Sequence, residues 1–351
     1  MGRIEAQISP FFVASQMGTS SFNLEEKRVT TEIRKHKAKR VLIQLPEGLK
    51  PYAPTIATII DKAGAQAFVS ADPCYGACDM AIREAQAISA DVIIHFGHTQ
   101  MIEQTSVPVV YFETRAKVDV KAARRRALPL LKPWDSIGLV TTVQHIHKYD
   151  IIKDMLLKEK KKVVVGDAGN LKYPGQVIGC DYSNAKAVED QIDAFLFVGG
   201  GKFHAVGVSL ATSKPTIVAD PYEKRAYSVE NEAQKIRKRR MTSISEAKQA
   251  ETFGVLIGLK IGQNRLQKAV EIKDKLEAKG RKAILFTARE ITPEALMQFP
   301  TIDAFVNTAC PRIVFDDSPR FPKPMLTINE ALIAIGEMDW ETLCRKGWFE
   351  N

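Results

Sequence analysis

Two short stretches, Ile192-Asp-Ala-Phe-Leu-Phe197 and Ile302-Asp-Ala-Phe-Val306, share one pattern in which an acidic turn leads into an apolar strand. A related stretch, Ala90-Asp-Val-Ile-Ile-His95, lies earlier in the chain. Self-similarity that recurs at a long period is typical of a repeated structural unit. The three stretches therefore predict three copies of one unit, and each stretch is predicted to form the third strand of its copy.

Three further apolar runs accompany each of these stretches, and helix-like segments separate them. Short apolar strands of this kind, without polar alternation, are typical of a parallel sheet that is covered by helices on both faces. We therefore expect an α/β protein with three repeated small domains, each a four-stranded parallel sheet flanked by helices, around a pseudo-threefold centre. The predicted strands are 41–45, 67–70, 90–95 and 107–111, then 137–143, 162–166, 192–197 and 214–218, and finally 253–259, 283–287, 302–306 and 323–327.

The repeats also predict the domain boundaries. The chain is divided into an N-terminal arm (1–23), α/β repeat 1 (24–132), α/β repeat 2 (133–245), α/β repeat 3 (246–335) and a C-terminal tail (336–351). A helix is expected from about Asn23, which is a suitable cap, with Glu25 and Glu26 in the first turn.

Composition excludes some classes of protein. The 351 residues are 45% hydrophobic and 26% charged, which is ordinary for a globular protein. No apolar run is long enough to span a membrane, and the first residues lack the pattern of a secretory signal. The net charge of +9 reflects either solvated helix faces or attraction to an acidic partner, and no RNA-binding motif accompanies it. We therefore expect a cytoplasmic protein with no membrane contact and no direct nucleic-acid partner.

Each repeat places one cysteine in a loop rich in proline or glycine that follows a predicted strand: Cys74, Cys180 and Cys310. Parallel α/β sheets bind ligands at the carboxyl ends of their strands, so the three thiols are expected at equivalent edges. Five cysteines in a cytoplasmic chain do not predict a disulfide framework. Three thiolates suit a 4Fe–4S cluster with one open iron, or a zinc ion with a fourth ligand. The alternative is that all three are small buried apolar side chains.

The strings around these cysteines resemble the archaeal first-step enzymes of diphthamide biosynthesis, a family of noncanonical radical S-adenosylmethionine enzymes. The resemblance covers residues 23 to 330. The strings that carry it are Ala71-Asp-Pro-Cys-Tyr-Gly-Ala-Cys78, Gly175-Gln-Val-Ile-Gly-Cys180, Thr308-Ala-Cys-Pro-Arg-Ile313, Gln44-Leu-Pro-Glu-Gly-Leu49 and Gly199-Gly-Gly-Lys-Phe-His204. Like that family, this chain lacks the usual CxxxCxxC loop. Cys74 and Cys78 have the CxxxC spacing, but position 81, where the third cysteine would stand, is Ala81.

The resemblance implies a function for the three cysteines. Cys74, Cys180 and Cys310 would each donate one ligand to a 4Fe–4S cluster, which would cleave S-adenosylmethionine reductively. The 3-amino-3-carboxypropyl radical would then add to C2 of a histidine of translation elongation factor 2, and methylthioadenosine would be released. The enzyme is expected to be a homodimer that needs an electron donor. Neither Cys78 nor Cys344 is expected to be a ligand.

Several residues are candidates for binding the amino-acid end of S-adenosylmethionine. Backbone N–H groups of Gly199, Gly200 and Gly201 can hold a carboxylate, although these glycines also suit a simple tight turn. Arg289 and Arg312 can pair with the same carboxylate, or form ordinary ion pairs between domains. Two further candidates, His204 and Asp220, either contact the substrate or serve the structure alone.

Three other functions remain open at this stage. One is a quinolinate synthase-like dehydratase, a class whose resemblance to this chain lies in three α/β repeats that share one 4Fe–4S cluster. A non-catalytic iron–sulfur subunit for electron transfer would need the same ligands, and a zinc-stabilised RNA-binding protein would use the basic surface. Reductant-dependent release of methylthioadenosine distinguishes the radical enzyme from the dehydratase.

Overall fold

The acidic turn of the repeated stretch has the same role in all three repeats. In the computed structural model, which describes residues 21–349, one carboxylate oxygen each of Asp91, Asp193 and Asp303 accepts two backbone N–H groups. The donors lie at the start of the first strand of each sheet, where the ladder has not yet begun. They are Lys39 and Arg40, Asp135 and Ser136, and Glu251 and Thr252, at distances of 2.7–3.1 Å.

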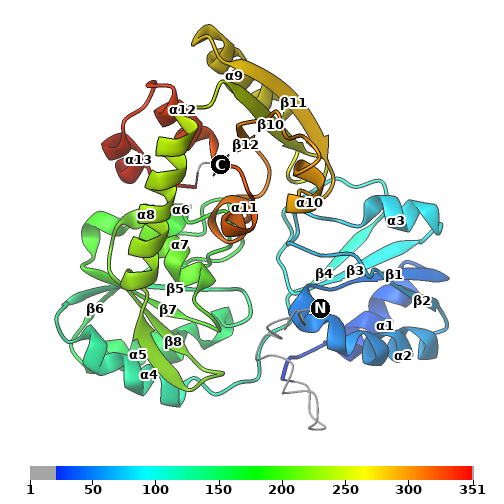
Figure 1. Ribbon diagram of the computed structural model, residues 1–351. Coiled ribbons are helices and arrows are strands. Elements are labelled where there is room, and N and C mark those ends of the chain that lie inside the picture. The colour runs from blue at the N-terminus through cyan, green and yellow to red at the C-terminus, as the bar shows by residue number, and fades with distance from the viewer. Residues whose placement is uncertain (1–20, 350–351) are drawn as a thin grey trace, which may run out of the picture. The chain divides into compact units, whose positions relative to one another are not determined.

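Three sheets with one strand order form the fold (Figure 1). The first sheet has the order β2-β1-β3-β4 and the third has β11-β10-β12-β13, with all strands parallel. The predicted α/β fold with three repeated domains is confirmed. The strands are β1 (Arg40–Gln44), β2 (Gln66–Val69), β3 (Val92–Phe96), β4 (Val109–Phe112), β5 (Ser136–Thr141), β6 (Lys162–Val164), β7 (Ala194–Val198), β8 (Thr216–Asp220), β9 (Arg225–Ser228), β10 (Thr252–Gly258), β11 (Lys282–Ala288), β12 (Ala304–Asn307) and β13 (Met325–Leu326).

The second sheet differs from the prediction by one strand. Its order is β6-β5-β7-β8-β9, and β9 pairs with β8 in the antiparallel direction. The reversal begins at Asp220, whose Oδ1 accepts the backbone N–H groups of Tyr222 and Glu223. A short edge strand that contains Arg225 and Ser228 has no apolar run, so the sequence pattern did not predict it.

Helices cover the sheets. In the first domain α1 and α2 lie on one side of the sheet and α3 on the other (Figure 1). The predicted cap at Asn23 is wrong: α1 begins at Glu26 with Glu25 as its N-cap, and Asn23 accepts only the N–H of Glu25, at 3.1 Å, ahead of the helix. The helices are α1 (Glu26–Lys35), α2 (Ala53–Lys62), α3 (Ile82–Ala87), α4 (Lys121–Ala127), α5 (Tyr149–Lys158), α6 (Ser183–Lys186), α7 (Phe203–Thr212), α8 (Glu230–Ala247), α9 (Leu266–Ala278), α10 (Pro293–Leu296), α11 (Arg312–Phe315), α12 (Ile328–Ala334) and α13 (Trp340–Lys346), with 3₁₀ turns η2 (Glu47–Tyr52), η3 (Leu128–Leu131), η4 (Ile146–Lys148), η5 (Glu189–Gln191) and η6 (Ser318–Arg320).

The chain divides into two compact units. Unit 1 is Met1–Val118 and contains the first sheet, and unit 2 is Asp119–Asn351 and contains the other two. Helix α4 lies before the predicted boundary at residue 132, yet it packs against β8 and β9 of the second sheet. The predicted domain boundaries stay predictions, and residues 1–20 of the arm and 350–351 of the tail lie outside the described residues. Within residues 21–349, no helix has the length and apolar character that crossing a membrane requires.

The strand order determines where a ligand can bind. In each sheet the first and third strands of the repeat are neighbours, while the second strand lies on the outer side of the first. The chain therefore leaves the adjacent carboxyl ends of these two strands in opposite directions, which opens a crevice that parallel sheets use for ligands. In the first sheet this places Gln44 of β1 directly opposite His95 of β3.

Candidate metal centre

The loop that carries Cys74 is held by residues at the end of β1 and just after it. Glu47 accepts the backbone N–H of Cys74 through Oε1 at 3.2 Å. The amide of Gln44 donates to the carbonyl of Asp79 at 2.6 Å and accepts the N–H of Ala81 at 3.2 Å. The string Gln44–Leu49 thus holds the loop at Cys74 and after it, which gives this string a structural reason to accompany the cysteine.

The Cys74 side chain is buried, with 3% of its surface exposed. Burial, followed by the charges of Asp79 and Glu47, raises the pKa of the thiol to about 12. The side chain is therefore a neutral thiol at pH 7 in the absence of a cation. A bound metal ion reverses this preference, because a coordinated thiol loses its proton. Cys74 thus suits a metal ligand better than a reactive nucleophile.

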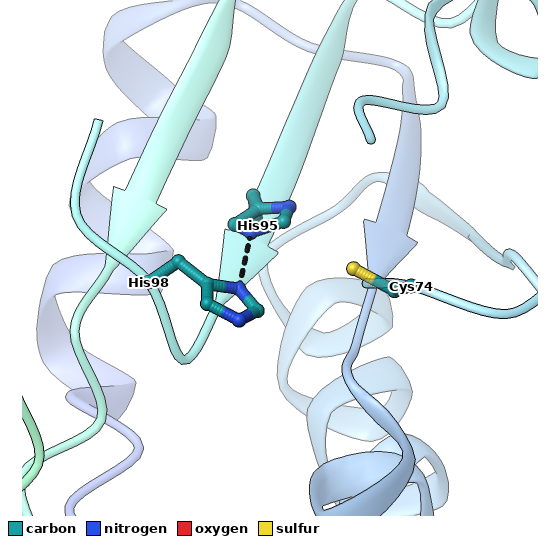
Figure 2. Close-up of side chains that lie close together, drawn as sticks. All are labelled: Cys74, His95 and His98. Atoms are coloured by element: carbon teal, nitrogen blue, oxygen red, sulfur yellow. Dashed lines mark hydrogen bonds between the residues drawn. The ribbon is translucent and has the colours of Figure 1, made fainter. Parts of the chain in front are cut away.

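Two histidines that the sequence analysis did not identify lie beside Cys74. The Nε2 atom of His95 is 2.9 Å from Nδ1 of His98, and Figure 2 shows both rings next to the cysteine side chain. Burial lowers the pKa of His98 to about 4 and that of His95 well below its usual value, so both rings are neutral at pH 7. Neutral imidazole is the form that binds metals.

A sequence feature that could have identified this pair is the position of His95 inside an otherwise apolar strand, Val92-Ile-Ile-His-Phe96. All five residues of β3 are buried, and a buried polar side chain needs a partner. Its partner is Gln44, whose Oε1 lies 3.0 Å from His95 Nδ1. The two residues belong to separate motifs and meet only through the register of β1 and β3.

In unit 2, the loop that carries Cys180 extends the second sheet before it turns. Thr141 at the end of β5 donates its N–H to Gly175 and accepts the N–H of Val177. The chain then reverses between Ile178 and Asp181, whose backbone groups bond to each other in both directions at 3.2 Å. Cys180 lies at the tip of this turn and is half-buried. The long loop after β6 thus carries its cysteine to the carboxyl edge of the sheet.

Cys310 follows β12 directly, at the carboxyl edge of the third sheet. Asn307 fixes this loop, because its amide nitrogen donates to the carbonyl of Cys310 at 2.9 Å and its oxygen accepts the N–H of Ala309 at 3.2 Å. Thr308 donates its hydroxyl to the carbonyl of Leu256 in β10 at 2.8 Å. Cys310 is buried, with 8% of its surface exposed.

The loops of Cys180 and Cys310 meet within unit 2. A pocket there is lined by residues of both, including Cys180, Asn307, Ala309, Pro311 and Phe349. Burial raises the pKa of the nearby Tyr182 hydroxyl well above its usual value, and the charges of Cys180 and Cys310 act in the same direction.

The arginine after Cys310 connects the same two loops. The guanidinium of Arg312 lies 4.5 Å from the centre of the Phe203 ring and bonds to Asp316 at 3.0 Å. Gly179, next to Cys180, has no room for a side chain, because a Cβ would lie 2.8 Å from that ring. Arg312 is thus near the two cysteines, as a residue that binds an anion there would be.

The remaining candidates for S-adenosylmethionine binding lie at the edges of the second and third sheets. Gly201 has a φ of +72° and donates its N–H to Asp220 at 2.9 Å, so Asp220 shapes the glycine loop as well as the turn into β9. His204 lies in α7 and stacks on Phe197 with ring centroids 6.0 Å apart. Arg289 follows β11 and is exposed. The role of Gly199, Gly200, Gly201, His204, Asp220, Arg289 and Arg312 towards this molecule stays a prediction.

No disulfide joins any of the five cysteines, all of which lie within the described residues. Cys78 is half-buried on the Cys74 loop, where its sulfur would lie 3.7 Å from a Cβ placed on Gly76. Cys344 lies in α13, beyond the third sheet.

Comparisons with known proteins connect these features to one family. The family model described as "Putative diphthamide synthesis protein" matches residues 45–344. A 2-(3-amino-3-carboxypropyl)histidine synthase of Pyrococcus horikoshii is 37% identical over 315 residues, which cover 89% of this chain and 90% of that protein. Subunit 1 of the human synthase is 29% identical over 354 residues, covering 97% of this chain and 80% of the human protein. The crystal structure of Dph2 from Pyrococcus horikoshii with a 4Fe–4S cluster superposes with a TM-score of 0.83 at 34% identity, covering 90% of this chain and 92% of that chain.

Proposed function

Because the chain belongs to the diphthamide synthesis family, we propose that it transfers the 3-amino-3-carboxypropyl group of S-adenosylmethionine to C2 of a histidine of translation elongation factor 2. The chain is an enzyme, a transferase of the 2-(3-amino-3-carboxypropyl)histidine synthase type, and its reaction is the first step of diphthamide synthesis. Its cofactors are a 4Fe–4S cluster and S-adenosylmethionine as the donor of the transferred group.

We assign the three cluster ligands to Cys74, Cys180 and Cys310. The observation that carries this assignment is that each of the three sheets presents one cysteine in a loop at its carboxyl edge. Cys180 and the neighbours of Cys310 line one pocket, and Cys74 is a buried thiol that a bound cation converts to a thiolate at neutral pH. Three thiolates leave one iron of a 4Fe–4S cluster open for a further ligand.

The cluster, when bound, supplies the electron that breaks the bond between the sulfonium sulfur and the γ-carbon of S-adenosylmethionine. The chain has to hold this molecule in one orientation and keep water away from its reactive carbon. We assign its carboxylate to Arg312, because the Arg312 side chain lies next to Gly179 of the Cys180 loop and the residue follows Cys310 by two positions. The glycine loop 199–201, with His204 and Asp220, and the exposed Arg289 complete the proposed set.

The partners of the reaction are part of the same proposal. The protein substrate is elongation factor 2, the active form is a homodimer, and an electron donor of the cell reduces the cluster. We place the reaction in the cytoplasm as part of this proposal. The dehydratase and the electron-transfer subunit are not favoured, because the matched relatives are named as histidine-modifying synthases.

The ligand assignment is tested with single variants, Cys74→Ala, Cys180→Ala and Cys310→Ala, purified and reconstituted anaerobically with iron and sulfide. We expect each variant to lose the cluster or to hold it at a small fraction of the wild-type iron content. Cys344→Ala is the matched control, because it removes a thiol that lies beyond the third sheet, and it should keep full iron content. Full cluster content in any of the three ligand variants contradicts the assignment.

A further inference from the structure

Three atoms that bind metals lie together inside unit 1. The sulfur of Cys74 and one ring nitrogen each of His95 and His98 all lie within 4.8 Å of one another. Figure 2 shows Cys74 pointing from its loop toward the two rings, which come from the end of β3 and from the segment after it. Cys74 and His95 are buried, and His98 is half-buried. This group belongs to unit 1 alone and needs no residue of unit 2.

The hydrogen bonds of Gln44 determine which nitrogen of His95 carries a hydrogen. The Gln44 amide cannot be flipped, because its nitrogen donates to the carbonyl of Asp79 and its oxygen accepts the N–H of Ala81. The same oxygen lies 3.0 Å from Nδ1 of His95, so Nδ1 is the donor. The Nε2 atom then has its lone pair directed at His98. A histidine that binds a metal usually donates its other N–H to an oxygen in this way.

His98 is held next to His95 by the turn at Gly97. This glycine has a φ of +87°, and a Cβ there would lie 3.0 Å from the Pro46 ring. Its N–H donates to the carbonyl of Phe112 at 2.7 Å and lies 3.1 Å from the hydroxyl oxygen of Thr114. The turn therefore has one backbone conformation, and it brings the His98 ring to 2.9 Å from Nε2 of His95.

We propose that Cys74, His95 and His98 form a mononuclear site that binds one divalent metal ion, with zinc as the best fit, in protein that lacks its cluster. Thiolate and neutral imidazole are ligands that zinc uses, and three protein ligands leave the fourth position of a tetrahedral site for water. Cobalt(II) and iron(II) accept the same ligands, with lower affinity expected from the usual order of divalent ions.

The two ring nitrogens need only a small adjustment to accept the ion, and the sulfur of Cys74 lies within 4.8 Å of them. Two nitrogens that each lie about 2.0–2.1 Å from zinc are about 3.3 Å apart in a tetrahedral site. Here Nε2 of His95 and Nδ1 of His98 are 2.9 Å apart. A modest rotation of the half-buried His98 ring supplies this difference. Binding converts the Cys74 thiol to a thiolate and releases one proton to the solvent. The hydrogen between the rings moves to the outer nitrogen of His98, so both imidazoles stay neutral.

The carboxylate of Glu47 adds to the attraction for a cation. Its Oε1 accepts the N–H of Cys74 at 3.2 Å, which places negative charge next to the sulfur. The ion would use the same thiolate that we assign to the cluster, so the two occupants exclude each other. The mutual exclusion of ion and cluster rests on the proposed function, whereas binding of the ion itself does not.

The test is a titration of the cluster-free, reduced full-length chain with Co²⁺, followed by its visible and near-ultraviolet absorption. We expect one bound ion per chain, with the strong visible bands of tetrahedral cobalt and a charge-transfer band from thiolate to cobalt. Cys74→Ser should lose the charge-transfer band, and His98→Ala should bind at least tenfold more weakly. Cys180→Ala, Cys310→Ala and His36→Ala are the controls, and they should bind as the wild type does.

Two results would overturn the proposal. One is a charge-transfer band that persists in Cys74→Ser, or that depends on Cys180 or Cys310. The other is the absence of bound cobalt in a wild-type chain whose circular dichroism shows it to be folded. If Cys74→Ser does not fold, His98→Ala and His98→Gln decide, because this side chain is half-buried and lies outside the strands. Iron–sulfur reconstitution of His98→Ala should still yield a full cluster, which separates this proposal from the ligand assignment.

Discussion

At the scale of single residues, the chemistry of the protein begins with a thiol that is buried as a neutral group. Burial, Asp79 and Glu47 raise the pKa of Cys74 from 9.0 to about 12. The folded chain therefore keeps a proton between pH 9 and pH 12 that the unfolded chain releases. The stability that this thiol contributes is fully present below pH 9 and is lost as the pH rises through this window.

This loss of stability with rising pH gives a first prediction for the cluster-free protein. The free energy of unfolding should fall more steeply above pH 9 in the wild type than in Cys74→Ala, because the variant has no thiol to titrate. Urea unfolding at a series of pH values measures both curves, and the difference between them removes the contribution of lysines and tyrosines. Curves that run parallel from pH 7 to pH 11 would show that Cys74 is not buried as a neutral thiol.

A site residue could be predicted from the sequence where it lies in a distinctive string. It could not be predicted where its role depends on the register of two strands. Cys74, Cys180 and Cys310 follow predicted strands and are surrounded by proline or glycine, so their positions at sheet edges could be inferred. His95 and Gln44 lie 51 residues apart and become partners only because β1 and β3 align them. Neither residue has a local pattern that specifies this pairing.

At the scale of elements, the carboxylate of the repeated acidic turn binds the backbone N–H groups at the start of the first strand of each sheet. The pKa of Asp91 and of Asp193 is lowered because backbone N–H groups bond to the carboxylates. These two groups therefore contribute stability at neutral pH that is lost as the pH falls through their lowered pKa values. The turn marks the third strand in the sequence, but its contact with the first strand requires the folded sheet.

The second prediction concerns the same turn in the third sheet. Asp303→Ala should lower the free energy of unfolding by about 1–3 kcal/mol, because two backbone N–H groups lose their acceptor. Chemical denaturation of the cluster-free chain measures the change. Asp274→Ala is the matched control on the exposed part of α9 and should change stability by less than about 0.5 kcal/mol. Equal effects of the two variants would remove the assigned role of the turn.

At the scale of the whole molecule, a buried ion pair connects the second and third sheets of unit 2. Arg240 of α8 is fully buried and bonds to Glu330 of α12 at 2.7 Å and 2.8 Å. Its guanidinium also donates to the backbone carbonyls of Val314 in α11 and Met325 in β13. The basic run Lys235–Arg240 was interpreted from the sequence as a solvated face or an acidic-partner site. Successive helix residues point in different directions, so one member of such a run can face the interior.

The third prediction follows from this pair. Arg240→Ala should destabilise the chain by about 3–5 kcal/mol, because it leaves the Glu330 carboxylate buried without its partner. Lys238→Ala, on the exposed side of the same helix, is the control. The double variant with Glu330→Ala should cost less than the sum of the two single changes, as thermal unfolding can show. Additive costs would mean that the two side chains act independently.

The fold of the three sheets was predictable because apolar strands and acidic turns are local patterns that recur. The course of the Cys180 loop was not predictable, because it follows from contacts such as those of Thr141 with Gly175 and Val177. The proposed threefold arrangement and the homodimer stay predictions.

The most direct test of the central claim is an anaerobic assay of the reconstituted, chemically reduced chain with S-adenosylmethionine and elongation factor 2. Mass spectrometry would follow the nucleoside product and the target histidine of the factor. The account predicts methylthioadenosine together with a 3-amino-3-carboxypropyl adduct on that histidine, both dependent on the reductant. A chain with a complete cluster that yields neither product would contradict it.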